Sequence, residues 1–311
     1  MNKNSVIRIG TRGSKLALWQ AYYVAERLEK SGLPTEVITI ETKGDRILDV
    51  SIDKIGSKGV FTEELEHQLS TGKIDVAVHS AKDLSSDIPD GFELITFTER
   101  EKVNDVLLSH KPLMLSHPGV EFKIGTSSTR RTAILKRFFP GVTTHPVRGN
   151  LQTRIRKMEE GQVDALLLAF AGVHRMQYDH MVVQTLSVDQ FIPPAGQGSI
   201  ALETGPDLPE EKIKKIRAAV NHINSEICIK AERSFLKRLQ GGCSIPVFAH
   251  ARLEDDEVII KGGIISLDGE QLIQHEVARK KENHEEAGLI LAEKVLKDGG
   301  DKILAEIKAL K

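Results

Sequence analysis

The chain has 311 residues, 40% of them hydrophobic, which is enough to fill the cores of two or three domains. Its 43 basic and 44 acidic residues nearly cancel, so no global field attracts nucleic acid or an anionic membrane. The longest apolar run, 165–173, is too short to cross a bilayer, and residues 1–6 contain no apolar segment typical of an export signal. We therefore expect a cytoplasmic protein of about three domains that binds neither nucleic acid nor membrane and holds any anion locally.

Two segments predict a strand, a loop and a helix in succession. The first has a strand over 6–9, after which Ser14 can cap a helix that runs to about Lys30. The second covers 122–139, where a strand leads through a serine-rich turn into a helix that ends before a proline. Each unit is typical of an α/β protein.

A short internal similarity indicates two related halves. Residues 72–78 resemble residues 161–167, since each segment begins with a glycine that can end a helix and continues as a buried strand. This similarity predicts two α/β lobes. Because such a pattern is common in α/β proteins, chance similarity is the alternative.

After about Asn221 the pattern becomes that of a small α+β domain. We expect the following elements: a helix to 239, strands over 247–251, 258–266 and 271–278, an amphipathic helix over 285–296 and a short terminal helix after Gly299-Gly300. The dipeptide Asp268-Gly269 predicts a hairpin between the last two strands.

Arginines recur where a strand ends and a helix begins, as at Arg12, Arg130, Arg131 and Arg148. Free N–H groups at a helix N-terminus favour an anion, and a guanidinium can clamp a carboxylate with two hydrogen bonds. Each arginine alone is equally consistent with a surface ion pair, but four at equivalent junctions favour a polycarboxylate ligand. No glycine-rich run ends in Gly-Lys-Ser/Thr, which disfavours nucleotide binding.

Lys82 and Asp83 adjoin at the expected carboxyl end of the strand over 74–78. Ligand sites concentrate at such strand ends, and an aspartate near cations can stabilise developing positive charge or transfer a proton. The alternative, which the sequence alone favours, is a salt bridge within the loop. A single histidine at a strand end is more often structural, so we assign His79 no catalytic role, and the scattered histidines predict no catalytic metal.

The chain has two cysteines, Cys228 and Cys243, whose spacing shows no zinc-binding pattern. They could form one disulfide, but in a reducing compartment we expect at least one free thiol. Cys243 follows two glycines, which let the backbone turn sharply and suit an accessible nucleophile, with a space-filling role as the alternative. Cys228 lies inside an expected helix and is interpreted as a packing residue.

Taken together, these motifs resemble the hydroxymethylbilane synthase family, also called the porphobilinogen deaminase family, from Ile7 to the last helix. They occur in the family's order: Arg-Ile-Gly-Thr-Arg-Gly-Ser at 8–14, Val-His-Ser-Ala-Lys-Asp at 78–83, Gly-Thr-Ser-Ser followed by Arg-Arg at 125–131, Arg-Gly-Asn at 148–150, Gly-Gln-Gly at 196–198 and Gly-Gly-Cys at 241–243. The chain departs from the usual pattern at Leu84-Ser85, Thr129 and Pro194-Ala195, which leaves the conformation of these loops open.

The resemblance implies an α/β fold with two periplasmic-binding-protein-like α/β domains around a cleft and a small C-terminal α+β domain. The first domain would comprise residues 1–99 and 197–217, and the second 103–192. The third would comprise 220–311 and carry the cofactor cysteine. A monomer is also implied.

The resemblance further implies a transferase that joins four porphobilinogen molecules head to tail, with loss of ammonia, on a dipyrromethane primer. Hydrolysis would then release linear hydroxymethylbilane for tetrapyrrole (haem) biosynthesis. Cys243 would hold dipyrromethane through a thioether, and Asp83 would stabilise the cationic azafulvene and handle the protons of each coupling.

The remaining site residues are also implied by the resemblance. Those that would bind the cofactor are Lys82, Thr126, Ser128, Arg130, Arg131, Arg148 and Gly149. Those that would bind the substrate or growing chain are Arg12, Ser14, Arg154, Arg175, Gln197, Lys54 and Lys58. The last two fall within 42–61, which is a mobile loop over the cleft in this family.

Two other classes of protein remain as alternatives. A solute-binding protein of the same two-lobed architecture would need arginines but no chemistry, and the Gly-Gly-Cys turn and the missing export signal argue against it. A regulatory protein with a LysR-like effector module would normally carry a helix-turn-helix segment with a basic recognition helix, which the sequence lacks.

Overall fold

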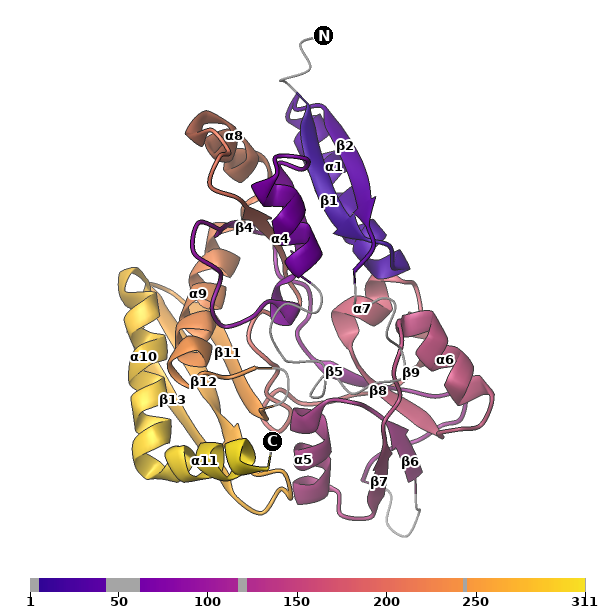
Figure 1. The fold of residues 1–311 in the computed structure, drawn as a ribbon. Coiled ribbons are helices and arrows are strands. Elements are labelled where there is room, and N and C mark those ends of the chain that lie inside the picture. Colours follow the sequence, from indigo (N-terminus) through magenta and orange to yellow (C-terminus); the bar gives the residue numbers. More distant parts are fainter. Residues whose placement is uncertain (1–5, 43–61, 117–121, 243–244, 311) are drawn as a thin grey trace. The chain divides into compact units, whose positions relative to one another are not determined.

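The computed structural model describes residues 6–42, 62–116, 122–242 and 245–310 (Figure 1). The chain divides into two compact units, Met1–Glu101 with Ser199–Glu226 and Lys102–Gly198 with Ile227–Lys311. The boundaries expected for three domains stay predictions. Within the described ranges, no helix combines the length and apolar character needed to cross a membrane.

The first unit is built on a five-stranded sheet with the order β2-β1-β3-β10-β4. Its strands are β1 (Ile7–Arg12), β2 (Thr35–Ile40), β3 (Val76–Ser80), β4 (Glu93–Phe97) and β10 (Ile200–Thr204). β1 pairs in parallel with β2 and β3, whereas β10 runs antiparallel to β3 and β4. The carboxyl ends of β1 and β3 therefore lie at one edge of this sheet.

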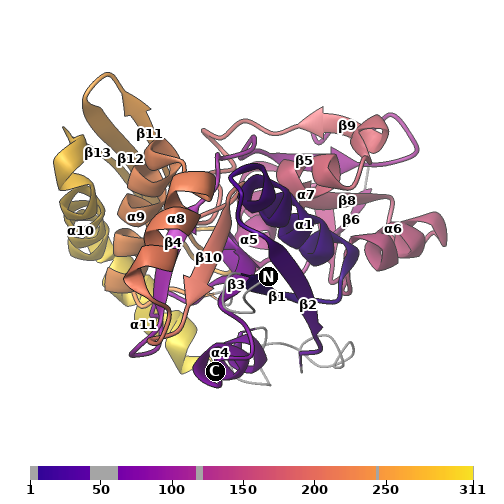
Figure 2. The ribbon, with the colours of Figure 1, turned by 90° about the horizontal axis from the view of Figure 1, so that it is seen from above.

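Helices cover both faces of the first sheet. Successive side chains of a strand point to opposite faces of the sheet. Val76 and Val78 therefore join a core with α1 (Lys15–Lys30) and α8 (Glu210–Val220), while Ala77 packs with α4 (Glu63–Ser70) on the other face. Figure 2 shows α1 and α4 on opposite faces. As predicted, α1 is capped by Ser14 and ends at Lys30.

The second unit contains a five-stranded sheet in the order β7-β6-β8-β5-β9, with the same pattern of parallel and antiparallel pairing as the first. Its strands are β5 (Asp105–Leu108), β6 (Phe122–Gly125), β7 (Val142–His145), β8 (Ala165–Ala169) and β9 (Val182–Thr185). β6 is parallel to β7 and β8, and β5 is antiparallel to β8 and β9. The antiparallel strand β5 comes first in the chain, whereas β10 comes last in the first sheet. The described part of this lobe contains the α-helices α5 (Thr129–Phe138), α6 (Leu151–Glu159) and α7 (Phe170–Arg175).

The repeated glycines confirm the two predicted halves. Gly72 and Gly161, at the ends of α4 and α6, have φ angles of 64° and 78°, and each precedes a buried strand, β3 or β8. This left-handed conformation is accessible to glycine without steric cost, which explains why the same residue recurs at both places.

A smaller antiparallel sheet follows in the chain, with the order β11-β12-β13. Its strands are β11 (Val247–Glu254), β12 (Glu257–Ile265) and β13 (Leu272–Lys280), and its helices are α9 (Ile223–Arg238), α10 (His284–Val295) and α11 (Asp301–Ala309). The expected hairpin at Asp268-Gly269 joins β12 to β13. β11 extends three residues beyond its predicted end at 251, because the turn to β12 comes only at Asp255, which has a φ of 51°.

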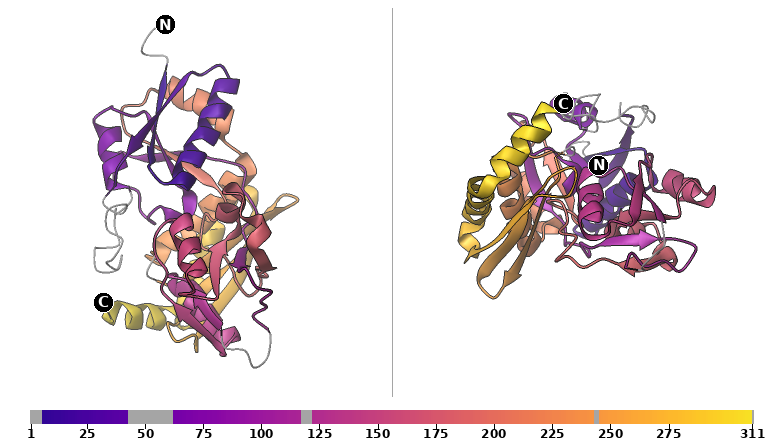
Figure 3. Two further views of the ribbon diagram at one scale, coloured as in Figure 1. Left: turned by 90° about the vertical axis from the view of Figure 1, so that its right-hand side faces the viewer. Right: turned by 90° about the horizontal axis from the view of Figure 1, so that it is seen from below.

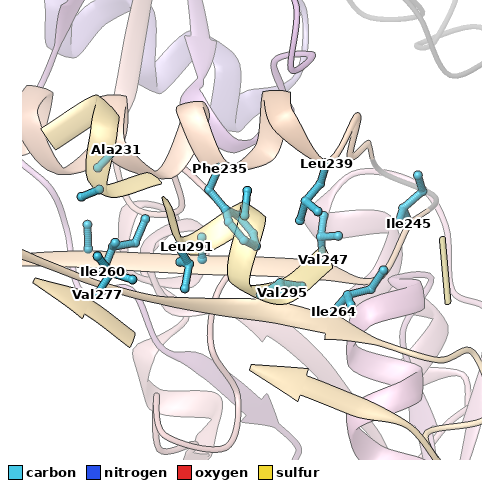
Figure 4. Close-up of a cluster of buried hydrophobic side chains, with 14 of the residues drawn as sticks. Ala231, Phe235, Leu239, Ile245, Val247, Ile260, Ile264, Val277, Leu291 and Val295 are labelled. Atoms are coloured by element: carbon cyan, nitrogen blue, oxygen red, sulfur yellow. The ribbon is translucent and has the colours of Figure 1, made fainter. Parts of the chain in front are cut away.

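The smaller sheet has an apolar core on each face. On one face Phe235 of α9 and Leu291 of α10 pack against strand residues that include Ile260 (Figure 4). Figure 3 shows α10 running beside this sheet. On the other face Phe248 and Ile265 join the core around β5 and β6 of the second lobe. The mixed α/β class with a C-terminal α+β module, predicted from the sequence, is confirmed.

Candidate functional site

Asp83 lies where β3 leaves the first sheet. β3 ends at Ser80, and a single 3₁₀ turn over Ala81–Asp83 follows. The N–H of Ala81 donates to the carbonyl of Ser199 at 3.0 Å, and Leu84 is buried, so both sides of the turn are anchored. The Asp83 side chain is exposed, and no hydrogen bond or ion pair joins it to another described residue. Its carboxylate is therefore accessible to a ligand.

Arg12 and Ser14 leave the same edge of the first sheet, at the end of the neighbouring strand β1. Arg12 is the last residue of β1 and is half-buried. The Ser14 hydroxyl accepts the N–H of Ala17 at 3.3 Å and so caps α1. Lys82, half-buried beside Asp83, adds a second cation to this edge. This edge of the first sheet therefore combines basic groups with one exposed carboxylate.

In the second unit, Arg130 and Arg131 converge on a buried aspartate. Nη2 of Arg130 lies 2.6 Å from Oδ2 of Asp105, and Nη2 of Arg131 lies 2.6 Å from Oδ1. Asp105 is 0% exposed, and the two arginines are 4% and 7% exposed. These three side chains carry a net charge of one positive unit, because two guanidiniums share one carboxylate.

Further donors complete this Asp105 cluster. Nε2 of Gln197 donates to Oδ1 of Asp105 at 3.0 Å and to the carbonyl of Val103 at 2.7 Å. Nη1 of each arginine donates to a backbone carbonyl at 2.9 and 3.0 Å. Nε of Arg131, however, is buried and has no hydrogen-bond partner among the described residues. A buried guanidinium N–H without an acceptor is unfavourable, so the cluster is suited to one further anion.

The electrostatics of the Asp105 cluster follow from burial and pairing. Burial alone would raise the pKa of Asp105, but the charges of Arg130 and Arg131 outweigh it and hold the pKa well below its usual range. Burial lowers the pKa of Arg130, and Asp105 offsets part of this effect. Asp105 is therefore ionised at neutral pH and cannot act as a general acid there.

The N-terminus of α5 lies beside the Asp105 cluster. The Ser128 hydroxyl caps α5 by accepting the N–H of Arg131 at 3.4 Å, and Oγ1 of Thr126 accepts the N–H of Ser128 at 3.3 Å. The positive end of α5 thus coincides with the arginine pair, an arrangement that favours carboxylate binding.

The turn before α6 carries Arg148 and Gly149. Gly149 has a φ of 107°, which favours glycine, and its carbonyl accepts Nε of Arg154 at 2.8 Å. Arg148 is half-buried just before this turn. Arg175, at the end of α7, donates from Nη2 to the carbonyl of Gly198 at 2.7 Å.

Three predicted site residues, Cys243, Lys54 and Lys58, lie outside the described residues. On either side of the cysteine motif, the N–H of Ile245 donates to the carbonyl of Gly242 at 3.0 Å. Leu239 and Ile245 are both buried in the core of the C-terminal module. Residues on both sides of the motif therefore contribute to this core.

Sequence reasoning missed Asp105. Its only signal is a single acidic residue at the start of the apolar run Val106–Leu108. The donor set of the Asp105 cluster fits a carboxylate-bearing group, and the described residues contain no cluster of His, Cys, Asp or Glu that could hold a metal ion.

Two family models match the chain. "Porphobilinogen deaminase, dipyromethane cofactor binding domain" matches residues 7–213, and "Porphobilinogen deaminase, C-terminal domain" matches residues 226–297. The chain belongs to the porphobilinogen deaminase family. The porphobilinogen deaminase of Cytophaga hutchinsonii is 54% identical over 98% of both chains, and that of Desulfosudis oleivorans is 54% identical over 97% of this chain and 98% of its own.

These matches confirm the expected family, the assignment as a transferase and the dipyrromethane cofactor of porphobilinogen deaminases. Neither a solute-binding protein nor a regulator is favoured, since the two models together cover nearly the whole chain. Among solved structures, a double mutant of the BvgS VFT2 domain of Bordetella pertussis aligns with 75% of this chain and 94% of its own. Its identity is 16% and the TM-score is 0.44.

Proposed function

We propose that Asp83 is the catalytic carboxylate and that the Asp105 cluster binds cofactor carboxylates in the reaction of the porphobilinogen deaminase family. In that reaction four porphobilinogen molecules are condensed on dipyrromethane, ammonia is lost, and hydroxymethylbilane is released for tetrapyrrole biosynthesis. The observation that carries the proposal is the Asp105 cluster, whose surplus positive charge and unpaired Nε of Arg131 fit a carboxylate.

The proposed division of labour follows from charge. When bound, dipyrromethane supplies the pyrrole carbon that accepts each new unit. Arg130 and Arg131, with the caps of α5, would fix acidic side chains of this group, and Arg148 and Gly149 would do so at the α6 turn. The role of Thr126 would be to orient Ser128, whose N–H it accepts.

Asp83 would act on the substrate. Porphobilinogen becomes cationic when ammonia departs, and a nearby carboxylate stabilises that charge. Asp83 would then accept the proton that each coupling releases. The other cations proposed to hold substrate or the growing chain are Arg12, Arg154, Arg175, Lys54 and Lys58, together with the polar residues Ser14 and Gln197 and, on the cofactor side, Lys82.

The proposed attachment point is Cys243. Cys228, the other cysteine, is 7% exposed and lies within the hydrophobic core of the C-terminal module, which supports a packing role for it. We also propose that the chain acts as a monomer in the cytoplasm, which size-exclusion chromatography and cell fractionation would test.

The experiment is an intact-mass measurement of the purified protein, combined with an acidic aldehyde colour test for pyrroles. The protein without substitutions should show the added mass of a dipyrrole and give a positive colour test. The Cys243→Ser variant should be folded but show neither the added mass nor the colour. Cys228→Ser is the matched control and should retain the adduct. An adduct that persists in Cys243→Ser, or that disappears in Cys228→Ser alone, would contradict the attachment point.

A further inference from the structure

A buried pair of titratable side chains lies at the carboxyl end of β3, outside the residues assigned above. His79 of β3 and Glu203 of β10 are 7% and 0% exposed, and Nε2 of His79 lies 3.0 Å from Oε2 of Glu203. The direction of this contact is poor, so neither Nε2 nor either carboxylate oxygen has a hydrogen-bond partner among the described residues. The fold brings these groups together without an optimal hydrogen bond.

Stability offers no reason for this pair. Burying polar groups without hydrogen bonds is unfavourable, whereas apolar side chains at the same positions would carry no such cost. Apolar packing is possible on this face of β3, because Ala77, two residues before His79, packs against Leu65 and Leu69 of α4. A costly pair beside an apolar contact indicates a functional role.

The pair adjoins the turn that carries Asp83. Ser80 and Ile200 form the last pair of the ladder between β3 and β10, one residue beyond His79. The N–H of Ala81 then donates to the carbonyl of Ser199, just before β10, at 3.0 Å. Asp83 follows within the same turn. The direction in which Asp83 leaves the sheet therefore depends on how the end of β3 is held against β10.

Irregular pairing directs Glu203. The register between β10 and β4 shifts between Leu202 and Glu203, and such irregularities redirect side chains near active sites. On the α4 side, burial raises the pKa of Glu66, and the charge of Glu203 adds to this effect, while Thr62 and His79 oppose it. Glu203 therefore lies close enough to Glu66 of α4 to affect the pKa of that residue.

We infer that His79 and Glu203 are positioning residues for the reaction, acting through β3 to hold Asp83 in its productive orientation. This inference rests on the catalytic role proposed for Asp83. Small misplacements of a reacting group are costly, since about 1 Å can lower a rate by roughly 10²-fold.

The first test is Glu203→Gln, which keeps the shape of the side chain and removes its charge. In holoenzyme whose cofactor has been confirmed by mass, kcat should fall by ~10- to 100-fold with little change in the KM for porphobilinogen. Unchanged kcat would overturn the inference. If this variant does not fold, the apolar pair His79→Leu with Glu203→Leu supplies the same test, and normal turnover of that pair would equally overturn it.

A matched control lies at the other end of β3. Asp75, just before the strand, pairs with Arg8, whose Nε lies 3.0 Å from Oδ2. Asp75→Asn should lower the free energy of unfolding but leave the kcat of the folded holoenzyme unchanged. If Asp75→Asn and Glu203→Gln lower kcat equally, the effect is a general loss of strand stability and the inference fails.

A double-mutant cycle separates this inference from the proposed function. If Glu203 acts through Asp83, adding Glu203→Gln to Asp83→Asn should cause no further loss in single-turnover rate. A fully additive loss would overturn the inference. Full activity of Asp83→Asn alone would instead refute the role of Asp83, whereas full activity of Glu203→Gln alone would refute only the positioning role.

Discussion

The two five-stranded sheets share a pattern of parallel and antiparallel pairing but present opposite chemistry at the ends of their strands. In the first sheet, β3 leads to Asp83, an exposed carboxylate. In the second, β6 leads to Arg130 and Arg131, which are buried around Asp105. An exposed carboxylate can respond to a cation that appears during a reaction, whereas a buried guanidinium pair with surplus charge suits a permanently bound anion. Under the proposed function, similar scaffolds would support catalysis in one sheet and cofactor binding in the other through differences in burial and charge.

The largest effect on stability should follow from removing the carboxylate at the centre of the buried Asp105 cluster. Asp105→Asn leaves two guanidiniums buried without a counter-charge, and removing one partner of a buried ion pair typically costs about 3–5 kcal/mol. We expect the free energy of unfolding at pH 7, measured with urea, to fall by about this amount, and cofactor loading to fall with it. Equal stability of variant and unmodified protein would show that the Asp105 cluster contributes nothing to the fold.

The pH dependence of the Asp105 variant sharpens this test. Because pairing lowers the pKa of folded Asp105, its contribution is fully present above the pKa of the unfolded group, about 3.9. It decreases as the pH falls below that value and is fully lost below the lower pKa of the folded group. The difference in unfolding free energy between unmodified protein and Asp105→Asn should therefore be constant near neutrality and shrink below about pH 4. A difference that changes between pH 6 and 8 would point to another titrating group.

Substitution of the exposed carboxylate, Asp83, should affect turnover and not stability. Asp83→Asn keeps the shape of the side chain and removes its charge, so turnover should fall by about 10²- to 10³-fold because the substrate cation loses its counter-charge. Stability should hardly change, since Asp83 is exposed. The measurement is single-turnover kinetics on protein with confirmed dipyrromethane. Near-normal elongation would move the catalytic role elsewhere, and normal elongation only at high substrate would show that Asp83 serves binding.

A smaller effect is expected at the α6 turn. Each charge-assisted hydrogen bond to a cofactor or chain carboxylate is worth about 1.5–3 kcal/mol, so Arg148→Leu should impair cofactor assembly or elongation, as should loss of Arg130 or Arg131. Arg156→Leu is the matched control, because Arg156 is an exposed arginine of α6 that pairs at the end of its own helix. Its Nε lies 3.6 Å from Oε1 of Glu160. Cofactor occupancy measured by intact mass distinguishes the two variants, since only Arg148→Leu should lower it. Normal holoenzyme assembly and turnover in variants of all three predicted arginines would make them ordinary structural residues.

Local features of the fold were predictable, whereas partners distant in sequence were not. The serine caps at Ser14 and Ser128 depend on neighbouring residues, and the sequence alone predicts the helices they begin. Asp105, in contrast, precedes Arg130 by 25 residues, and only the sheet brings them together. The arginines are identified by their junctions, but their burial depends on packing that periodicity does not encode.

The same limit applies to His79. Its place at a strand end favours a structural interpretation, and the sequence gives no sign that the Glu203 side chain lies beside it, diagonally across the pairing of β3 with β10. The two residues are far apart in the chain and meet only because β10 returns to pair antiparallel with β3. Elements and motifs are therefore predictable from the sequence, whereas contacts between polar side chains are not where they depend on a returning strand.

The smallest predicted effect compares the equivalent serine caps of the two sheets. Ser14 accepts the N–H of Ala17 at 3.3 Å and Ser128 accepts that of Arg131 at 3.4 Å, so alanine at either position should cost about 1 kcal/mol in unfolding free energy. The functional consequences should differ, because only the Ser128 cap fixes the first turn of the helix that carries the buried arginine pair. We expect Ser128→Ala to lower cofactor occupancy measured by intact mass, and Ser14→Ala to leave it unchanged while weakening substrate binding. If both variants lose the cofactor to the same extent, occupancy follows general stability, and the division between a binding sheet and a catalytic sheet would not hold.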